Sequence, residues 1–192
     1  MKNLIKQRIR DSIDVKTALL SNENLTGGVA AVAEALADCL ARGGKLVLCG
    51  NGGSASDALH FAGEIVGRFQ KERAAWPAVV LNADVATMTA IANDYSYDDV
   101  FARQAQAHVT EKDLFLGVST SGNSENVYRA MLVAGEKGAK TAALLGKDGG
   151  KIAGLADLPL VIPCNTTARV QECHIMLIHI ICEIVEGCLE NE

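Results

Sequence analysis

His60 and Glu64 are four residues apart in a segment with helical periodicity. Residues at this spacing lie on one face of a helix, with Cβ atoms about 5–6 Å apart. A histidine and a glutamate placed in this way can bind a metal ion or act as an acid and a base. The same spacing also suits an ordinary surface hydrogen bond. The segment that precedes the helix helps to decide between a functional site and such a bond.

The helix with His60 follows a loop of glycine and small polar residues at 50–54, which itself follows a short apolar run at 45–49. This order places backbone N–H groups at a helix N-terminus, where partial positive charge attracts anions and sugar oxygens. The loop lacks the G-x-G-x-x-G spacing of dinucleotide-binding folds. We interpret it as a place where the backbone can approach a sugar, close to His60 and Glu64.

A second loop, at 119–124, lies between an apolar run and a helical segment that ends near residue 136. It contains four hydroxyl groups and a glycine, and no Gly-Lys-Ser/Thr of a P-loop follows it. Hydroxyl donors together with helix N-terminal N–H groups suit a phosphate monoester. The alternative is a helix N-cap by Ser124, but one cap does not need four hydroxyls. We therefore predict that the phosphate binds here.

The last helical segment, at about 167–189, is mostly apolar but contains two histidines, a glutamine and a glutamate. A buried polar group without a partner costs about 1–3 kcal/mol, so these groups are paired or face a site. Glu172 and His179 are seven residues apart and share a face. Gln171 and His179 lie about 12 Å apart along the axis, so a metal bound by both lies between them or takes them from different chains. We favour a satisfied core position for His174 and a functional role for His179.

The elements that position these residues alternate along the chain. Five apolar runs of strand length, separated by helical segments, lie at 45–49, 78–81, 114–118, 141–145 and 158–162. This alternation predicts a parallel α/β sheet with helices on both faces and a ligand site beyond the carboxyl ends of the strands. Two helices, at 2–20 and 26–42, come first. They form either an arm for packing or oligomerisation, or one more layer on the core.

The composition is that of a soluble globular protein: 192 residues, 49% of them apolar and 21% charged, with a net charge of −5. We expect a single domain over residues 1–192, with 1–43 as its N-terminal arm. The charge argues against a nucleic-acid partner. We see no secretory signal, and the longest apolar stretch covers about half a bilayer, so we expect a cytoplasmic protein without a membrane partner. No two of the six cysteines form a C-x-x-C pair. We therefore expect reduced cysteines, most of them small residues of the core.

These motifs resemble the sedoheptulose 7-phosphate isomerases (phosphoheptose isomerases), a branch of the sugar isomerase (SIS) domain superfamily. The serine-rich loop alone would indicate only a SIS domain, whereas the four residues His60, Glu64, Gln171 and His179 are much more specific. The resemblance covers essentially the whole chain, including the segments 49–54, 60–64, 67–68, 92–94, 119–124, 149–150 and 169–179. It implies a three-layer, flavodoxin-like α/β fold of the SIS type with a five-stranded parallel sheet.

The resemblance also implies an activity, which is the aldose–ketose isomerisation of D-sedoheptulose 7-phosphate to D-glycero-D-manno-heptose 7-phosphate. This reaction begins the synthesis of the heptose nucleotides used in bacterial surface glycans such as lipopolysaccharide. The family is homotetrameric, with active sites at subunit interfaces and a zinc ion in some members, so we expect one zinc ion per subunit here.

Matched motif by motif, the resemblance implies three groups of site residues. The zinc ligands are His60, Glu64, Gln171 and His179. The phosphate cradle is Ser119, Thr120, Ser121 and Ser124. The remaining substrate contacts are Asn51, Gly52, Gly53, Ser54, Arg68, Asn93 and Asp94, with Glu64 and Gln171 also facing the substrate. We assign Glu64 as the base and His179 as the acid, with zinc polarising an oxygen. Some relatives have aspartate where this chain has Ala168, so no role of that aspartate is assumed here.

Two other functions fit parts of this pattern. A non-catalytic SIS tetramer that binds a replication initiator protein is a close relative, but it lacks the full His/Glu/His set that this chain retains. An isomerase of another sugar phosphate, such as arabinose 5-phosphate, usually adds a paired regulatory module for which this chain has no room.

Overall fold

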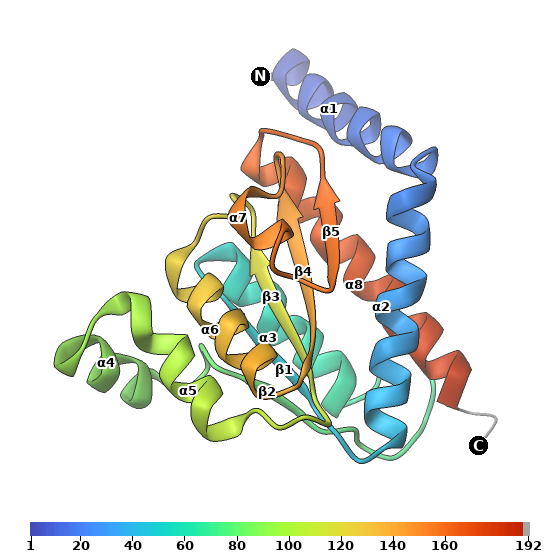
Figure 1. Cartoon of the computed structure of the whole chain (residues 1–192). Coiled ribbons are helices and arrows are strands. Elements are labelled where there is room, and N and C mark those ends of the chain that lie inside the picture. Colours follow the sequence, from blue (N-terminus) through green and yellow to red (C-terminus); the bar gives the residue numbers. More distant parts are fainter. Residues whose placement is uncertain (190–192) are drawn as a thin grey trace.

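A five-stranded parallel sheet forms the centre of the computed structural model, which describes residues 1–189 (Figure 1). Its strands are β1 Leu46–Gly50, β2 Ala78–Val80, β3 Leu114–Ser119, β4 Lys140–Gly146 and β5 Leu158–Ile162, in the order β2-β1-β3-β4-β5. Every residue of β1 and β3 is buried, as expected of parallel strands covered on both faces. The predicted fold class is confirmed.

Eight α-helices and one short 3₁₀ helix surround the sheet in the described part of the chain. They are α1 Lys2–Leu20, α2 Glu23–Ala41, α3 Gly53–Val66, α4 Val85–Asp94, the 3₁₀ helix η1 Tyr97–Asp99, α5 Val100–His108, α6 Glu125–Glu136, α7 Gly150–Ala153 and α8 Thr167–Leu189. Helix α2 begins three residues before the predicted start because the Asn22 side chain caps it, accepting the N–H of Leu25. Helix α7 was not predicted, since four residues are too few to show a helical period.

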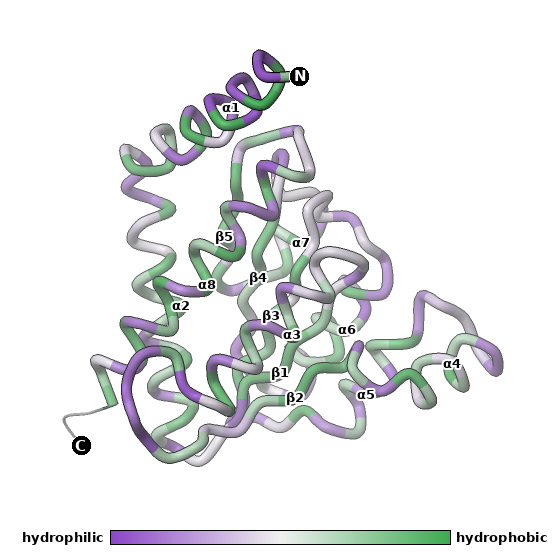
Figure 2. Tube along the Cα trace, turned by 180° about the vertical axis from the view of Figure 1, so that it is seen from behind, coloured by the Kyte–Doolittle hydropathy of each residue, from purple (hydrophilic) through white to green (hydrophobic). Residues whose placement is uncertain are grey.

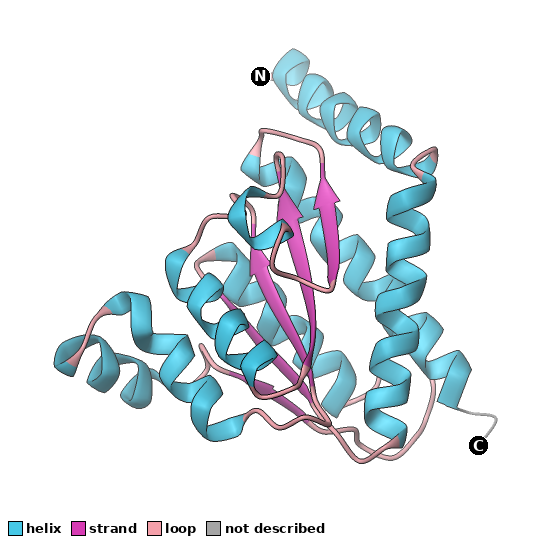
Figure 3. Cartoon of the chain, viewed as in Figure 1, coloured by secondary structure: helices cyan, strands magenta, loops and turns pink. Residues whose placement is uncertain are grey.

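The helices cover the sheet in two layers, which gives the three-layer arrangement seen in Figure 3. Leu46 and Leu48 of β1 face helices α2, α3 and α8, whereas Val47 and Cys49 face helices α4 to α7. This alternation is the two-residue period of a strand, and it divides the core into two apolar clusters. Figure 2 shows the hydrophobic residues concentrated along the strands and the helices that cover them.

The two predicted ligand loops lie side by side at the carboxyl edge of the sheet. Strand β1 pairs with β2 on one side and with β3 on the other, so the direction of winding changes between β1 and β3. Gly50 is opposite Val118 in this register, and the loops that follow β1 and β3 therefore begin next to each other. Ligands of open parallel sheets bind at such a point.

Helix α1 leaves the body of the chain and carries an exposed apolar stripe (Figure 1). Ile5, Ile9 and Ile13 expose 58%, 55% and 55% of their surface, and Leu19 is the residue of this helix that is buried. Helix α2, in contrast, packs on the core. The N-terminal segment was expected to be either an arm or an added layer of the core. The description as a core layer applies to α2 but not to α1.

All six cysteines are free, as expected. Four of them (Cys39, Cys49, Cys173 and Cys182) are buried, as expected of small residues in a core. Among the helices of residues 1–189, none combines the length and the apolar character that crossing a membrane requires.

Candidate active site and metal centre

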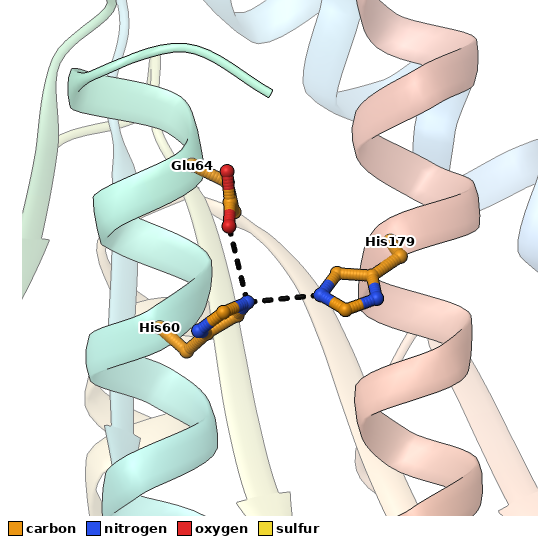
Figure 4. Close-up of side chains that lie close together, drawn as sticks. All are labelled: His60, Glu64 and His179. Carbon is orange, nitrogen blue, oxygen red and sulfur yellow. Dashed lines mark hydrogen bonds and ion pairs between the residues drawn. The ribbon is translucent and has the colours of Figure 1, made fainter. Parts of the chain in front are cut away.

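Three side chains from two helices converge at one point, as Figure 4 shows. The Nε2 atom of His60 lies 3.1 Å from Oε1 of Glu64 and 2.9 Å from Nε2 of His179. The ligand atoms of all three residues lie within 4.8 Å of one another. The structure thus brings together three of the four residues expected to bind zinc.

The local folds explain this convergence. His60 and Glu64 lie one turn apart on α3, and α3 and α8 pack against each other on the same face of the sheet. His179 projects from α8 toward the two residues of α3 (Figure 4). The ring of Phe69 stacks on the His179 imidazole with 5.5 Å between centroids and 26° between planes. Phe69 was not predicted, because an aromatic residue in a loop has no periodicity that points to a site.

The three residues fit a metal ion such as zinc. Two histidine nitrogens and a carboxylate oxygen form a common catalytic zinc set that leaves a fourth position open. Ligands bound tetrahedrally at about 2.0–2.1 Å lie about 3.3 Å from one another. The His60–His179 and His60–Glu64 separations of 2.9 and 3.1 Å are close to this value, and all three ligand atoms lie within 4.8 Å of one another. The side chains of His60 and Glu64 expose 44% and 22% of their surface, so an ion can enter from solvent.

Gln171, the fourth expected ligand, lies near the start of α3 in this chain. Its side chain covers Gly53, where a Cβ atom would lie 2.1 Å from Nε2 of Gln171. Gly53 begins α3 and lies two turns before His60. A side chain at this position would displace the Gln171 amide from the start of α3. Gln171 faces the glycine loop, where it can contact a substrate.

The serine loop forms a compact cluster of hydroxyls. Ser119 Oγ lies 2.9 Å from Ser124 Oγ and 3.4 Å from Ser121 Oγ. Ser124 occupies the N-cap position of α6, but its side chain makes no capping hydrogen bond. The simple N-cap interpretation is therefore wrong, and the first-turn N–H groups of α6 remain oriented toward the loop. Gly122 has φ of 66° and meets the backbone of Gly149, so no side chain fits there.

Asn51 joins the glycine loop to the first turn of α6, the helix that follows the serine loop. Its Nδ2 donates to Oδ1 of Asn126 at 2.8 Å, and Nδ2 of Asn126 donates back to Oδ1 of Asn51 at 3.0 Å. The Tyr97 hydroxyl donates to the same Oδ1 of Asn51 at 2.8 Å. Asn126 is buried, and neither Asn126 nor Tyr97 was predicted. The sequence feature that points to Asn126 is a polar residue on the apolar face of a helix.

The other predicted substrate contacts lie at the start of α3, just after α3 and at the end of α4. Gly52, with φ of 56°, and buried Ser54 lie at the start of α3 beside Asn51. Arg68, Asn93 and Asp94 are exposed. Asn93 donates to Asp94 at the end of α4, and Arg68 lies 3.5 Å from Glu72. Within the described residues, no hydrogen bond or ion pair joins these three to the His/Glu/His cluster.

Asp57 on α3 and His174 on α8 have shifted pKa values. Burial raises the pKa of Asp57, one turn before His60, to about 6, and the charge of His60 opposes this shift. Oδ2 of Asp57 is buried without a partner. Burial lowers the pKa of His174 to about 4, although a hydrogen bond with the Leu145 carbonyl opposes the shift. His174 is fully buried, which confirms its assignment to the core.

Comparison with known proteins identifies the family. The SIS domain model matches residues 13–146. A phosphoheptose isomerase of Geobacter sulfurreducens is 51% identical over 182 residues, covering 95% of each chain.

Solved structures agree with this match. A phosphoheptose isomerase from Neisseria gonorrhoeae has a TM-score of 0.90 and 40% identity, covering 97% of this chain and 98% of its own. Another from Francisella tularensis has a TM-score of 0.91 and 35% identity, with coverage of 96% and 97%. The chain is thus similar to these enzymes over nearly its whole length. It belongs to the phosphoheptose isomerase family of SIS-domain proteins.

Proposed function

We propose that this chain is an aldose–ketose isomerase that converts D-sedoheptulose 7-phosphate to D-glycero-D-manno-heptose 7-phosphate. The observation that carries the proposal is the convergence of His60, Glu64 and His179 within 4.8 Å. A relative that is 51% identical in sequence is named a phosphoheptose isomerase. The product would feed the synthesis of heptose nucleotides for surface glycans.

The substrate has two ends, and the carboxyl edge of the sheet offers a matching pair of loops. The hydroxyls of Ser119, Ser121 and Ser124 and the first N–H groups of α6 suit the phosphate. The glycine loop, without side chains at Gly52 and Gly53, lets the sugar approach the start of α3. The reacting carbons then face His60 and Glu64 farther along the same helix.

The reaction moves a proton between C1 and C2 through an enediol, while a second proton moves between the two oxygens. Glu64 would take the proton from carbon and return it to the neighbouring carbon. His179 would donate a proton to the carbonyl oxygen and accept one from the hydroxyl. A zinc ion held by His60, Glu64 and His179 would polarise the substrate oxygen when bound. Because Oε1 of Glu64 faces His60, the other carboxylate oxygen is the one available as a base.

We also propose a homotetramer with sites shared between subunits. The exposed stripe of α1 continues into an apolar groove of about 530 Å³ between α1, α2 and α8. Ile13, Leu20 and Ile180 line it, and a second copy of α1 supplies an occupant of the same apolar character. Asn93 and Asp94 are exposed at the end of α4, and we propose that they contact the substrate bound at a neighbouring subunit. Mixing Glu64→Gln and Asp94→Ala chains tests this: regained activity supports shared sites, and none contradicts them.

A substrate assay tests the activity. The protein is incubated with sedoheptulose 7-phosphate, with and without Zn²⁺, and the aldoheptose phosphate is followed. Arabinose 5-phosphate at the same concentration serves as the competing substrate. Conversion of the heptulose in preference to the pentose supports the proposal. An absence of conversion under both metal conditions contradicts it and would favour a binding role for this SIS domain.

A further inference from the structure

A buried carboxylate on α8 holds the loop that follows α3. Glu186 is only 2% exposed and lies seven residues after His179. It accepts four hydrogen bonds of 2.9–3.0 Å, from the backbone N–H groups of Phe69, Gln70 and Lys71 and from Nε of Arg73. Three consecutive backbone donors on one carboxylate fix the position of this loop segment.

The charge of Glu186 is well compensated. Burial alone would raise the pKa of its carboxyl, but the three backbone donors and Arg73 together lower it. Glu186 is therefore ionised in the folded protein at neutral pH. An ionised acceptor makes stronger hydrogen bonds than a neutral one, so the loop is held firmly against α8.

Arg73 extends this contact to the helix with Glu64. Its Nη2 donates to the carbonyl of Glu64 at 2.8 Å, and its Nη1 donates to the carbonyl of Ile65 at 3.0 Å. These carbonyls belong to the last turn of α3, where no intrahelical donor is available. The guanidinium also lies 3.6 Å from the ring centroid of Trp76. Arg73 thus joins the end of α3 to Glu186 on α8.

Phe69 extends the same contact to the other helix of the site. Its backbone N–H is bound by Glu186 while its ring stacks on His179. Residues seven apart lie on the same helix face, about 10 Å apart, which one loop residue can span. The ring packs on one face of the imidazole and so limits its rotation away from His60.

We propose that Glu186 and Phe69 are positioning residues for the His60/Glu64/His179 cluster. Glu186 holds the loop at 69–73, Phe69 orients the imidazole of His179, and Arg73 fixes the end of α3 beside Glu64. This inference rests on the proposed function, since it assumes that the cluster binds a metal ion. A loop with a purely structural role would affect stability but leave the geometry and affinity of the metal site unchanged.

Co²⁺ alone serves as the probe, because its visible absorption reports ligand geometry and its titration gives an affinity. The test variant is Phe69→Leu, which removes the ring, and Phe69→Tyr is the conservative variant that keeps it. Glu186→Gln removes the charge that binds the loop. Glu183→Gln is the matched control, since Glu183 lies one turn earlier on α8 and is exposed.

We expect Phe69→Leu to weaken Co²⁺ binding about tenfold and to shift the absorption bands, as loss of groups that orient metal ligands commonly does. Its kcat should fall by a similar factor with little change in KM. Phe69→Tyr and Glu183→Gln should match the wild type, and Glu186→Gln should resemble Phe69→Leu.

If Phe69→Leu binds Co²⁺ with wild-type affinity and spectrum, the positioning role is overturned, whatever its thermal stability. The Phe69 variants give this answer even if Glu186→Gln does not fold. A wild-type protein that binds no Co²⁺ would count against the metal centre of the proposed function as well. The two failures are therefore distinguished by the wild-type titration.

Discussion

The Nε2 atoms of His60 and His179 lie 2.9 Å apart, although the two residues are 119 positions apart in the chain. At this distance the two nitrogens share one proton or one metal ion, because two N–H groups cannot point at each other. Glu64 adds a carboxylate oxygen 3.1 Å from the same His60 nitrogen. The fold thus directs three ligand atoms at one point between α3 and α8.

Replacing His60 should abolish the metal site and leave substrate binding largely intact. We expect His60→Ala to reduce kcat by at least about 100-fold while KM changes little, because a metal ion that polarises a substrate oxygen is worth several kcal/mol. Metal content per chain, measured after dialysis, should fall in parallel. A variant that keeps its metal and its turnover would show that His60 is only a surface partner of Glu64.

Replacing Ser121 should have the opposite effect. Ser121 Oγ accepts the N–H of Asn123 at 3.1 Å and lies in the hydroxyl cluster. Losing a hydrogen bond to a charged phosphate costs about 1.5–3 kcal/mol, so Ser121→Ala should raise KM at least about tenfold. Metal content should remain as in the wild type. A fall in kcat with unchanged KM would contradict the division between the two loops.

His174 should make the fold sensitive to mild acid. Its pKa falls from 6.5 to about 4 on folding, because burial disfavours the charged ring. The folded state therefore binds fewer protons than the unfolded state, and its stability decreases as the pH falls from 6.5 toward 4. The full effect is about 3 kcal/mol, of which about 2 kcal/mol is lost by pH 5.

Urea unfolding of His174→Gln at pH 7 and pH 5 tests this sensitivity. Glutamine can still donate to the Leu145 carbonyl but cannot become charged, so the variant should lose about 2 kcal/mol less than the wild type between these pH values. His108→Gln, at an exposed histidine of α5, is the control. Equal pH dependence in all three proteins would exclude His174 as the cause.

Asn126 should stabilise the fold through its hydrogen bonds with Asn51. The two side chains exchange hydrogen bonds of 2.8 and 3.0 Å, and Asn126 is buried. Asn126→Ala should reduce stability by about 1–3 kcal/mol, because it removes a buried amide and leaves the half-buried amide of Asn51 partly unpaired. A double-mutant cycle with Asn51→Ala should be clearly non-additive. Additive losses would mean that the two residues act separately.

Much of the fold could be predicted because its signals are local. The apolar runs gave the strands to within one residue at each end, and β5 and α8 match the expected ranges. The start of α2 was missed because the Asn22 cap was not recognised as one. Helix α7 was missed because it depends on two glycines with positive φ and not on an apolar period.

The site was predictable where spacing alone decides it. His60 and Glu64 share a helix face, so their contact follows from their positions. The approach of His179 depends on the packing of α8 against α3, which only the family resemblance indicated. Phe69 and Glu186 could not be predicted from spacing, because their contacts join a loop to a helix more than 100 residues away.

The turnover of Glu64→Gln with sedoheptulose 7-phosphate tests the central claim most directly. Glutamine keeps the size of the side chain but cannot take a proton from carbon. We predict a kcat at least about 100-fold below that of the wild type, with an unchanged fold by circular dichroism. Near-normal turnover of the folded variant would contradict the assignment of Glu64 as the base.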